Sequence, residues 1–234
     1  MRLERYGDET DPDLVFVLGW GTKPEFEGVT WLLDRLREAG YHLHVFEIPT
    51  VVTDFEAEWL DPVADHVATL EAYRLLTHST GGLIGEFLDD PAPVTTVHLS
   101  PWWGFHEDLD NPVVDLAMKV PLPVPVLPAG IERAELGDLA TEAQVEQLPD
   151  RSAPTFLREA KRAQERLPPF DPETAVFYSP TDGVVSAPAI EERAPPANRV
   201  AYDGGHEFFS SSAREDHLDT LLAAVDRGVA ALEE

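Results

Sequence analysis

Short apolar runs alternate with amphipathic segments along most of this 234-residue chain, and that alternation limits the possible folds more than any other feature. Residues 14–18 are apolar and run into the loop Gly19-Trp20-Gly21, which is typical of a buried strand followed by a turn. Residues 28–39 carry apolar side chains at helical spacing, and Gly40 follows them. This pattern predicts an amphipathic helix that ends at a glycine.

The same alternation continues downstream. Further strands are predicted at residues 42–48, 73–77, 94–99, 174–178 and 199–202, and further helices at residues 54–72, 79–88 and 215–232. Alternating strands and helices predict a mostly parallel sheet with helices on both faces. A chain of this length is expected to form a single domain over residues 1–234.

The alternation stops at Ser100 and resumes near residue 174. Between these points lie Trp102, Trp103, a proline-dense stretch at residues 121–128 and two polar helical segments. Proline removes a backbone donor and disfavours a central strand, so residues 121–128 are predicted to form an extended surface loop. We expect residues 101–169 to be an insertion that forms a lid.

Charge is the unusual feature of the composition. The chain has 44 acidic and 17 basic residues, a formal net charge of -27, and lysine only at positions 23, 119 and 161. Such a surface repels nucleic acid and anionic membranes. Because the charges are spread along the chain, a folded protein adapted to high salt is favoured over an acidic tail or interaction module. The scarcity of lysine resembles that of proteins from salt-accumulating halophiles.

Cysteine is absent, which excludes disulfides, thiolate metal sites and a cysteine nucleophile. The first twelve residues are charged, and no apolar run approaches the roughly 20 residues needed to span a bilayer. A soluble cytoplasmic protein without membrane insertion is therefore expected, and its oligomeric state stays open.

Ser79 lies where a predicted strand runs directly into a predicted helix. A nucleophile on such a tight turn is exposed above the sheet, and small residues two positions away on either side, here Thr77 and Gly81, avoid collision. The helix N-terminus places the Thr80 backbone N–H where negative charge develops on a substrate oxygen. The alternative is a serine that only caps a helix.

Residues 77–82, Thr-His-Ser-Thr-Gly-Gly, resemble the G-x-S-x-G turn of the α/β-hydrolase family, with Thr77 in place of the first glycine. In that family an acid follows a late strand and a histidine follows the last one. Residues 176–185 and 200–209 look like these two segments. The resemblance therefore implies the α/β-hydrolase fold outside the insertion, with Ser79 as nucleophile, His206 as base and Asp182 as the acid that orients it.

Each of these assignments has an alternative. Asp182 would also suit a tight turn before Gly183. Asp203 is a rival acid, but only two residues separate it from His206, which makes the family's geometry hard to reach. His206 could be a structural imidazole that binds a carbonyl. The resemblance gives His78 a packing role. Core or surface roles are expected for the remaining histidines, which lack metal-ligand spacing: His42, His44, His66, His98, His106 and His217.

The loop at residues 18–21 stands where the family often has His-Gly-x-Gly, which implies that the Trp20 backbone N–H joins that of Thr80 in binding the oxyanion. Trp20 could also be explained by packing alone. The implied mechanism requires neither a metal nor an organic cofactor.

The insertion supplies candidates for the substrate pocket. Trp102, Trp103 and the apolar residues within 122–127 favour an apolar acyl or alcohol group, and hence a small carboxylic ester as substrate. An esterase or lipase is therefore predicted. A thioesterase or an amidase on the same residues, or a non-catalytic relative that binds a small apolar ligand, stays open.

Overall fold

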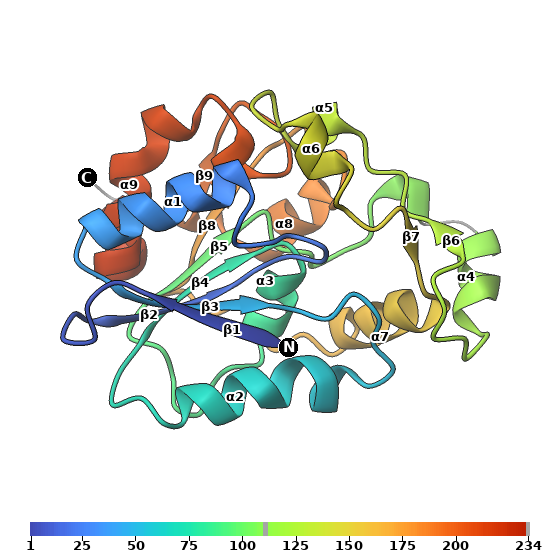
Figure 1. Cartoon of the computed structure of the whole chain (residues 1–234), viewed down its shortest axis with the longest axis horizontal. Coiled ribbons are helices and arrows are strands. Elements are labelled where there is room, and N and C mark those ends of the chain that lie inside the picture. Colours follow the sequence, from blue (N-terminus) through green and yellow to red (C-terminus); the bar gives the residue numbers. More distant parts are fainter. Residues whose placement is uncertain (110–111, 233–234) are drawn as a thin grey trace.

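A central sheet of seven strands organises the computed structural model, which describes residues 1–109 and 112–232 (Figure 1). Its spatial order is β1-β3-β2-β4-β5-β8-β9. The strands are β1 (Arg2–Tyr6), β2 (Asp13–Val17), β3 (His42–Glu47), β4 (Arg74–His78), β5 (Thr96–Leu99), β8 (Ala175–Tyr178) and β9 (Arg199–Ala201). All neighbouring pairs are parallel except β1 and β3. The predicted mostly parallel sheet is confirmed.

Helices cover both faces of this sheet. The α-helices of the described residues are α1 (Glu27–Glu38), α2 (Asp61–Val67), α3 (Thr80–Gly85), α4 (Pro112–Met118), α5 (Arg133–Leu136), α6 (Glu142–Val145), α7 (Pro154–Gln164), α8 (Ala187–Arg193) and α9 (Arg214–Arg227). Helices α1 and α9 pack on one face, and α2, α3, α7 and α8 contribute to the core on the other (Figure 1).

The burial of strand β2 on both faces of the sheet explains why its sequence is almost continuously apolar. Leu14 and Phe16 belong to the core beneath α1 and α9, whereas Val15 and Val17 belong to the core beneath α2 and α3. Successive side chains of a strand point to opposite faces, so a strand buried on both sides needs apolar residues at every position.

Two elements differ from the sequence-based expectation. Strand β1 was not predicted, because its exposed and half-buried residues are typical of an edge strand and lack an apolar run. The helix expected at residues 54–72 is a π-helical turn at Glu56–Leu60 followed by the shorter α2. Just past its end, the backbone N–H and the hydroxyl of Thr69 both donate to the His66 carbonyl, at 2.9 and 2.7 Å.

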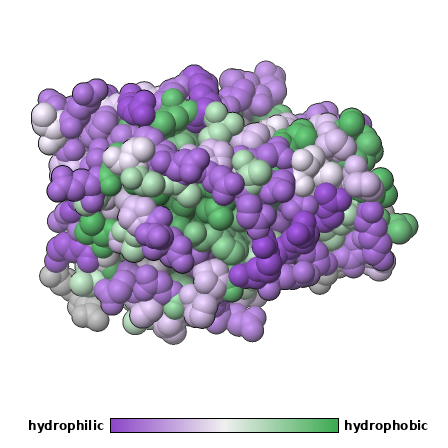
Figure 2. All heavy atoms as spheres, turned by 90° about the horizontal axis from the view of Figure 1, so that it is seen from below, coloured by the Kyte–Doolittle hydropathy of each residue, from purple (hydrophilic) through white to green (hydrophobic). Residues whose placement is uncertain are grey.

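Residues 101–169 contain α4 to α7 and a two-stranded sheet of β6 (Leu127–Pro128) and β7 (Arg151–Ser152). As predicted, most of the proline-dense stretch is extended and exposed at the surface. In the view from below, hydrophilic residues cover most of the molecule, and apolar residues show near its centre and at the right edge, where α4 and β6 lie (Figures 1 and 2). Within the described ranges, no helix combines the length and hydropathy that crossing a membrane requires.

Candidate active site

The candidate residues follow the carboxyl ends of four parallel strands. Trp20 lies in the loop after β2, Ser79 comes directly after β4, Asp182 follows β8 and His206 follows β9. Because parallel strands place their carboxyl ends at one edge of the sheet, the topology brings together residues that are up to 186 positions apart in the sequence.

Ser79 adopts a backbone conformation that is rare for a residue with a side chain. Its φ is 55° and its ψ is -118°, and it immediately precedes α3. Hydrogen bonds hold this turn: the Ser79 N–H donates to the Leu99 carbonyl at 3.0 Å, and the Ser79 carbonyl accepts from the Trp102 N–H at 2.9 Å. Such a strained position persists only where its surroundings determine it, and it is typical of functional sites.

Two glycines are required for the close packing around this turn. A Cβ atom on Gly81 would lie 2.1 Å from the Val17 carbonyl oxygen, and one on Gly19 would lie 2.8 Å from Cβ of Ser79. Both distances are shorter than a carbon contact allows. The loop after β2 can therefore approach Ser79, and the N-terminus of α3 can approach the end of β2, only because these positions lack side chains.

Thr77, which replaces the first glycine of the family motif, is accommodated by its own contacts. Its hydroxyl lies 2.6 Å from Nδ1 of His98 in β5. Glycines on α3 provide the space, since a Cβ on Gly85 would lie 2.9 Å from Cγ2 of Thr77. His98 in turn contacts Glu86 at 3.3 Å. Sequence reasoning recorded Thr77 as a departure but did not identify His98 as its partner.

Asp182 and His206 form a buried hydrogen-bonded pair. Nδ1 of His206 lies 2.8 Å from Oδ2 of Asp182, while Oδ1 of Asp182 accepts from the backbone N–H groups of Val184 and Val185 at 2.8 and 3.0 Å. An ionised carboxylate only accepts hydrogen bonds, so the proton of the neutral imidazole belongs on Nδ1 and its Nε2 keeps a lone pair. Asp203, the rival acid, is exposed.

The electrostatics of this pair follow from burial and mutual attraction. Burial opposes the charge on His206, but the charge and hydrogen bond of Asp182 outweigh it and raise the pKa of His206. Burial likewise opposes the charge on Asp182, yet its partner and the two backbone donors lower the pKa of Asp182 below the ordinary value. The pair therefore favours an ionised acid beside a base that gains a proton readily.

The histidine loop is docked directly onto helix α5 of the 101–169 segment. The backbone N–H of His206 donates to the Glu135 carbonyl at 2.7 Å, and that of Glu207 donates to the Leu136 carbonyl at 2.8 Å. Gly205 permits this approach, because a Cβ there would lie 2.6 Å from the Glu135 oxygen. The sequence did not predict this contact, because the residues around Glu135 show only the polar pattern of a surface helix.

Glu207 is a second buried carboxyl group beside the candidate base. Its Oε2 accepts hydrogen bonds from Nε2 of Gln144 at 2.7 Å and from the Ser210 hydroxyl at 2.5 Å. Burial raises the pKa of Glu207 despite these donors. Its side chain therefore joins α6, which carries Gln144, to the loop that carries His206.

His78 packs against the candidate base. Its buried ring lies 4.8 Å from the ring of His206 and 4.9 Å from that of Phe209, between centroids. Burial lowers the pKa of His78 well below the ordinary value, so the ring is neutral at pH 7. A neutral ring in this place adds contact area without opposing the charge that His206 acquires as a base.

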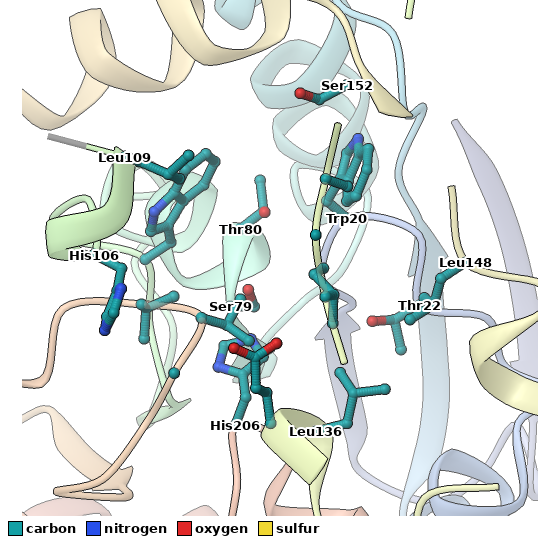
Figure 3. A pocket seen from close by; sticks show the side chains of 18 of the residues that line it. Trp20, Thr22, Ser79, Thr80, His106, Leu109, Leu136, Leu148, Ser152 and His206 are labelled. Atoms are coloured by element: carbon teal, nitrogen blue, oxygen red, sulfur yellow. The ribbon is translucent and has the colours of Figure 1, made fainter. Parts of the chain in front are cut away.

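Ser79 and His206 lie on the wall of one cavity of about 430 Å³ (Figure 3). Trp20, Thr80 and Trp102 also line it. Its other lining residues from the 101–169 segment are mainly apolar and include Leu109, Val114, Leu127, Ile131, Phe156 and Leu157. The shape and lining of the cavity suit an apolar group next to Ser79.

The aromatic candidates divide into two sets. Phe156 lies between Trp102 and Trp20, with ring centroids 5.4 and 5.1 Å away. Trp103 is absent from the cavity lining among the described residues and packs instead against His98 and Arg193. Of the two tryptophans expected in the pocket, only Trp102 therefore borders it.

Two backbone donors at the cavity are unused. In residues 1–109 and 112–232, neither the N–H of Trp20 nor that of Thr80 donates a hydrogen bond. The side chain of Trp20 is held separately, since its Nε1–H donates to the Thr50 carbonyl at 2.9 Å. Both residues also line the cavity.

Comparisons with solved structures identify the fold. No family model and no curated protein matches the chain. Among solved structures, the monoacylglycerol lipase of Paleococcus ferrophilus superposes with a TM-score of 0.74 at 18% identity, covering 98% of each chain. A soluble variant of monoglyceride lipase from Saccharomyces cerevisiae also gives 0.74, at 13% identity, covering 96% of this chain and 91% of that one.

A putative aryl esterase from Burkholderia cenocepacia gives a TM-score of 0.65 at 16% identity, covering 99% of this chain and 95% of that one. These three structures cover 96–99% of this chain. With a mostly parallel sheet flanked by helices and these close structural matches, the chain has the α/β-hydrolase fold.

Proposed function

We propose that the protein is a serine hydrolase that cleaves carboxylic esters, with Ser79 as nucleophile, His206 as base and Asp182 as the acid that orients the base. The observation that carries this proposal is the arrangement around one cavity. Ser79 has a positive φ at a strand-to-helix junction, and it shares the cavity with an imidazole whose Nδ1 is bound to a buried carboxylate.

The reaction follows from these groups. Nε2 of His206 accepts the Ser79 proton as the hydroxyl oxygen attacks the ester carbonyl carbon, and Asp182 stabilises the imidazolium that forms. The proton then passes to the departing alcohol oxygen as the carbon–oxygen bond breaks, leaving an acyl group on Ser79. The same imidazole then deprotonates a water that attacks the acyl carbon, and this proton passes to the Ser79 oxygen as its bond to the acyl carbon breaks and the carboxylic acid leaves.

The N–H groups of Trp20 and Thr80 bind the oxyanion in this proposal. Two observations support this assignment: both residues border the cavity, and neither N–H has an acceptor in the described part of the chain. Removing one such donor typically costs on the order of a hundredfold to a thousandfold in rate. The close approach of the two loops, which Gly19 and Gly81 permit, is therefore essential for the rate.

The substrate class rests on the cavity lining. The stacked rings of Trp102, Phe156 and Trp20 form an apolar wall beside Ser79, which favours an acyl chain over a peptide. The structural neighbours named as monoacylglycerol lipases and an aryl esterase are consistent with an ester substrate. Residues 101–169 act as a lid in this proposal, within a single domain over residues 1–234, since they supply much of the apolar wall.

The test is a hydrolysis screen of p-nitrophenyl esters from acetate to palmitate in molar KCl, with thioester and anilide analogues in parallel. We expect turnover of the esters, with a preference for chains that the cavity can hold, and loss of that preference in Trp102→Ala. Exclusive turnover of the thioesters or anilides would transfer the function to a thioesterase or an amidase. No turnover of any substrate would favour a non-catalytic ligand-binding protein.

A further inference from the structure

Three potential metal-binding side chains gather at the end of the sheet opposite Ser79. Asp13 begins β2, and it lies directly across from His42, which begins β3. His44 is two residues further along β3, so it projects from the same face as His42. Sequence reasoning assigned both histidines to core or surface roles, because the spacing alone does not show Asp13 beside them.

The polar atoms of these side chains converge. Oδ1 of Asp13 lies 2.9 Å from Nδ1 of His42 and 2.8 Å from Nε2 of His44. One donor atom from each residue lies within 4.8 Å of the others. Helix α2 covers the cluster, and Nε2 of His66 on that helix lies 3.0 Å from Nδ1 of His44. The cluster therefore consists of three candidate ligands, Asp13, His42 and His44, and of His66, which contacts His44.

We propose that Asp13, His42 and His44 bind a divalent transition-metal ion such as Zn²⁺, with His66 as the residue that orients His44. Two imidazoles and one carboxylate are a donor set that zinc-class ions accept, while Mg²⁺ and Ca²⁺ prefer oxygen alone. A metal-bound imidazole usually donates its other N–H to a hydrogen-bond acceptor, and His66 is placed to accept from Nδ1 of His44.

The two separations from Asp13 are close to those that an ion requires. Ligands about 2.0–2.2 Å from a tetrahedral ion lie roughly 3.4 Å apart, so the two short contacts would widen by about half an ångström. The Asp13 side chain can move by this amount because it is 27% exposed, and the same opening gives water access to the remaining coordination position. The rings of His42 and His44 are buried, with centroids 4.4 Å apart, and their donor nitrogens lie within 4.8 Å of each other, so a turn of either ring would bring them to the spacing that an ion requires.

The charge around the cluster suits a cation, because the carboxyl group of Asp13 faces both imidazoles. Arg5 lies across from His44 in the sheet and opposes a cation, but it is exposed and solvent screens it. The net charge of -27 attracts divalent cations in general.

Isothermal titration of the EDTA-treated, dialysed protein with Zn²⁺, Ni²⁺ and Mg²⁺ in molar KCl tests the proposal. We expect one equivalent of Zn²⁺ or Ni²⁺ to bind and to raise the melting temperature, with far weaker binding of Mg²⁺. His44→Leu and His42→Leu should lower the Zn²⁺ affinity by at least about a hundredfold, and His66→Leu by about ten- to a hundredfold. His217→Leu, on the distant helix α9, is the matched control and should bind Zn²⁺ as the wild type does.

Two results would overturn the site. Equal Zn²⁺ binding by the wild type and by His44→Leu would show that surface carboxylates bind the ion. No Zn²⁺ binding by the wild type would show that Asp13, His42 and His44 form only a hydrogen-bonded cluster. Should His44→Leu fail to fold, the visible spectrum of the wild-type protein with Co²⁺ replaces it: absorption typical of nitrogen ligation is expected, and a spectrum of aqueous Co²⁺ contradicts the site. Ester hydrolysis in these variants is a separate measurement, because the cluster lies at the other end of the sheet from Ser79.

Discussion

Nδ1 of His206 lies 2.8 Å from Oδ2 of Asp182, whose other oxygen is held by two backbone N–H groups. This arrangement leaves the carboxylate no freedom to turn and sets the tautomer of the imidazole. An amide at position 182 would instead present a donor to Nδ1 and favour the tautomer that cannot accept the serine proton.

Asp182→Asn should therefore lower kcat by about ten-thousand-fold. Asp203→Asn is the matched control, and because Asp203 is exposed, its kcat should change by less than about threefold. The measurement is steady-state hydrolysis of the best p-nitrophenyl ester. A larger loss in Asp203→Asn than in Asp182→Asn would transfer the role of the acid to Asp203.

The pH dependence of the reaction should report the raised pKa of His206. The imidazole must be neutral to accept the serine proton, so kcat/KM should rise with pH and reach half its maximum above the ordinary histidine value of about 6.5. The measurement is kcat/KM from about pH 5 to 9 at constant ionic strength. A midpoint at or below the ordinary value would contradict the influence of Asp182.

The raised pKa of Glu207 leads to a prediction about the stability of the protein. Its pKa is raised in the folded protein, so the folded state keeps a proton that the unfolded state has already lost above about pH 4.3. Stability from this group is thus fully present below that pH and declines as the pH rises through the folded pKa. Glu207→Gln keeps an acceptor for Gln144 and Ser210 but cannot ionise.

The melting temperature of Glu207→Gln relative to the wild type should therefore increase as the pH rises from about 4 to 8. Thermal unfolding of both proteins across this range measures the difference. A difference that stays constant with pH would show that the carboxyl group does not titrate differently in the folded and unfolded states. Asp203→Asn serves here as an exposed control.

The sheet could be predicted from sequence because β2, β4, β5 and β8 are buried on both faces and therefore read as apolar runs. Strand β1 could not, since an edge strand with charged residues has no such pattern. The Thr69 hydroxyl donates to the His66 carbonyl just past the end of α2, and sequence periodicity does not show where such a bond forms.

At the candidate site, motif order pointed to Ser79, Asp182 and His206, and the structure brings Asp182 and His206 into contact. What sequence reasoning missed depends on contacts between distant segments. The bond from the His206 N–H to the Glu135 carbonyl and the placement of Trp103 against His98 both join residues whose own neighbourhoods show no functional pattern.

The acidity of the chain leads to a prediction about salt. At about 0.01 M salt the Debye length is roughly 30 Å, so surface carboxylates repel one another across the whole molecule, whereas at about 1 M it is roughly 3 Å. The compact folded state suffers more from this repulsion than the unfolded chain. The net charge of -27 should therefore make the melting temperature rise steeply with salt.

Thermal unfolding in NaCl, NaBr and KCl from about 0.1 to 3 M at fixed pH measures this effect. Bromide salts out weakly, so a rise shared by all three salts separates charge screening from strengthened apolar burial. A flat melting temperature over the range would reject adaptation to high salt.

Covalent labelling by a fluorophosphonate in molar KCl tests the central claim most directly. The probe reacts only with a serine that a neighbouring base activates, so the wild-type protein should gain one label, located at Ser79 by peptide mass spectrometry. Ser79→Ala should take up no label, keep the fold and lose about four to six orders of magnitude in ester hydrolysis. Labelling of Ser79→Ala at another serine, or hydrolysis by that variant near the wild-type rate, would contradict the assignment of Ser79 as the nucleophile.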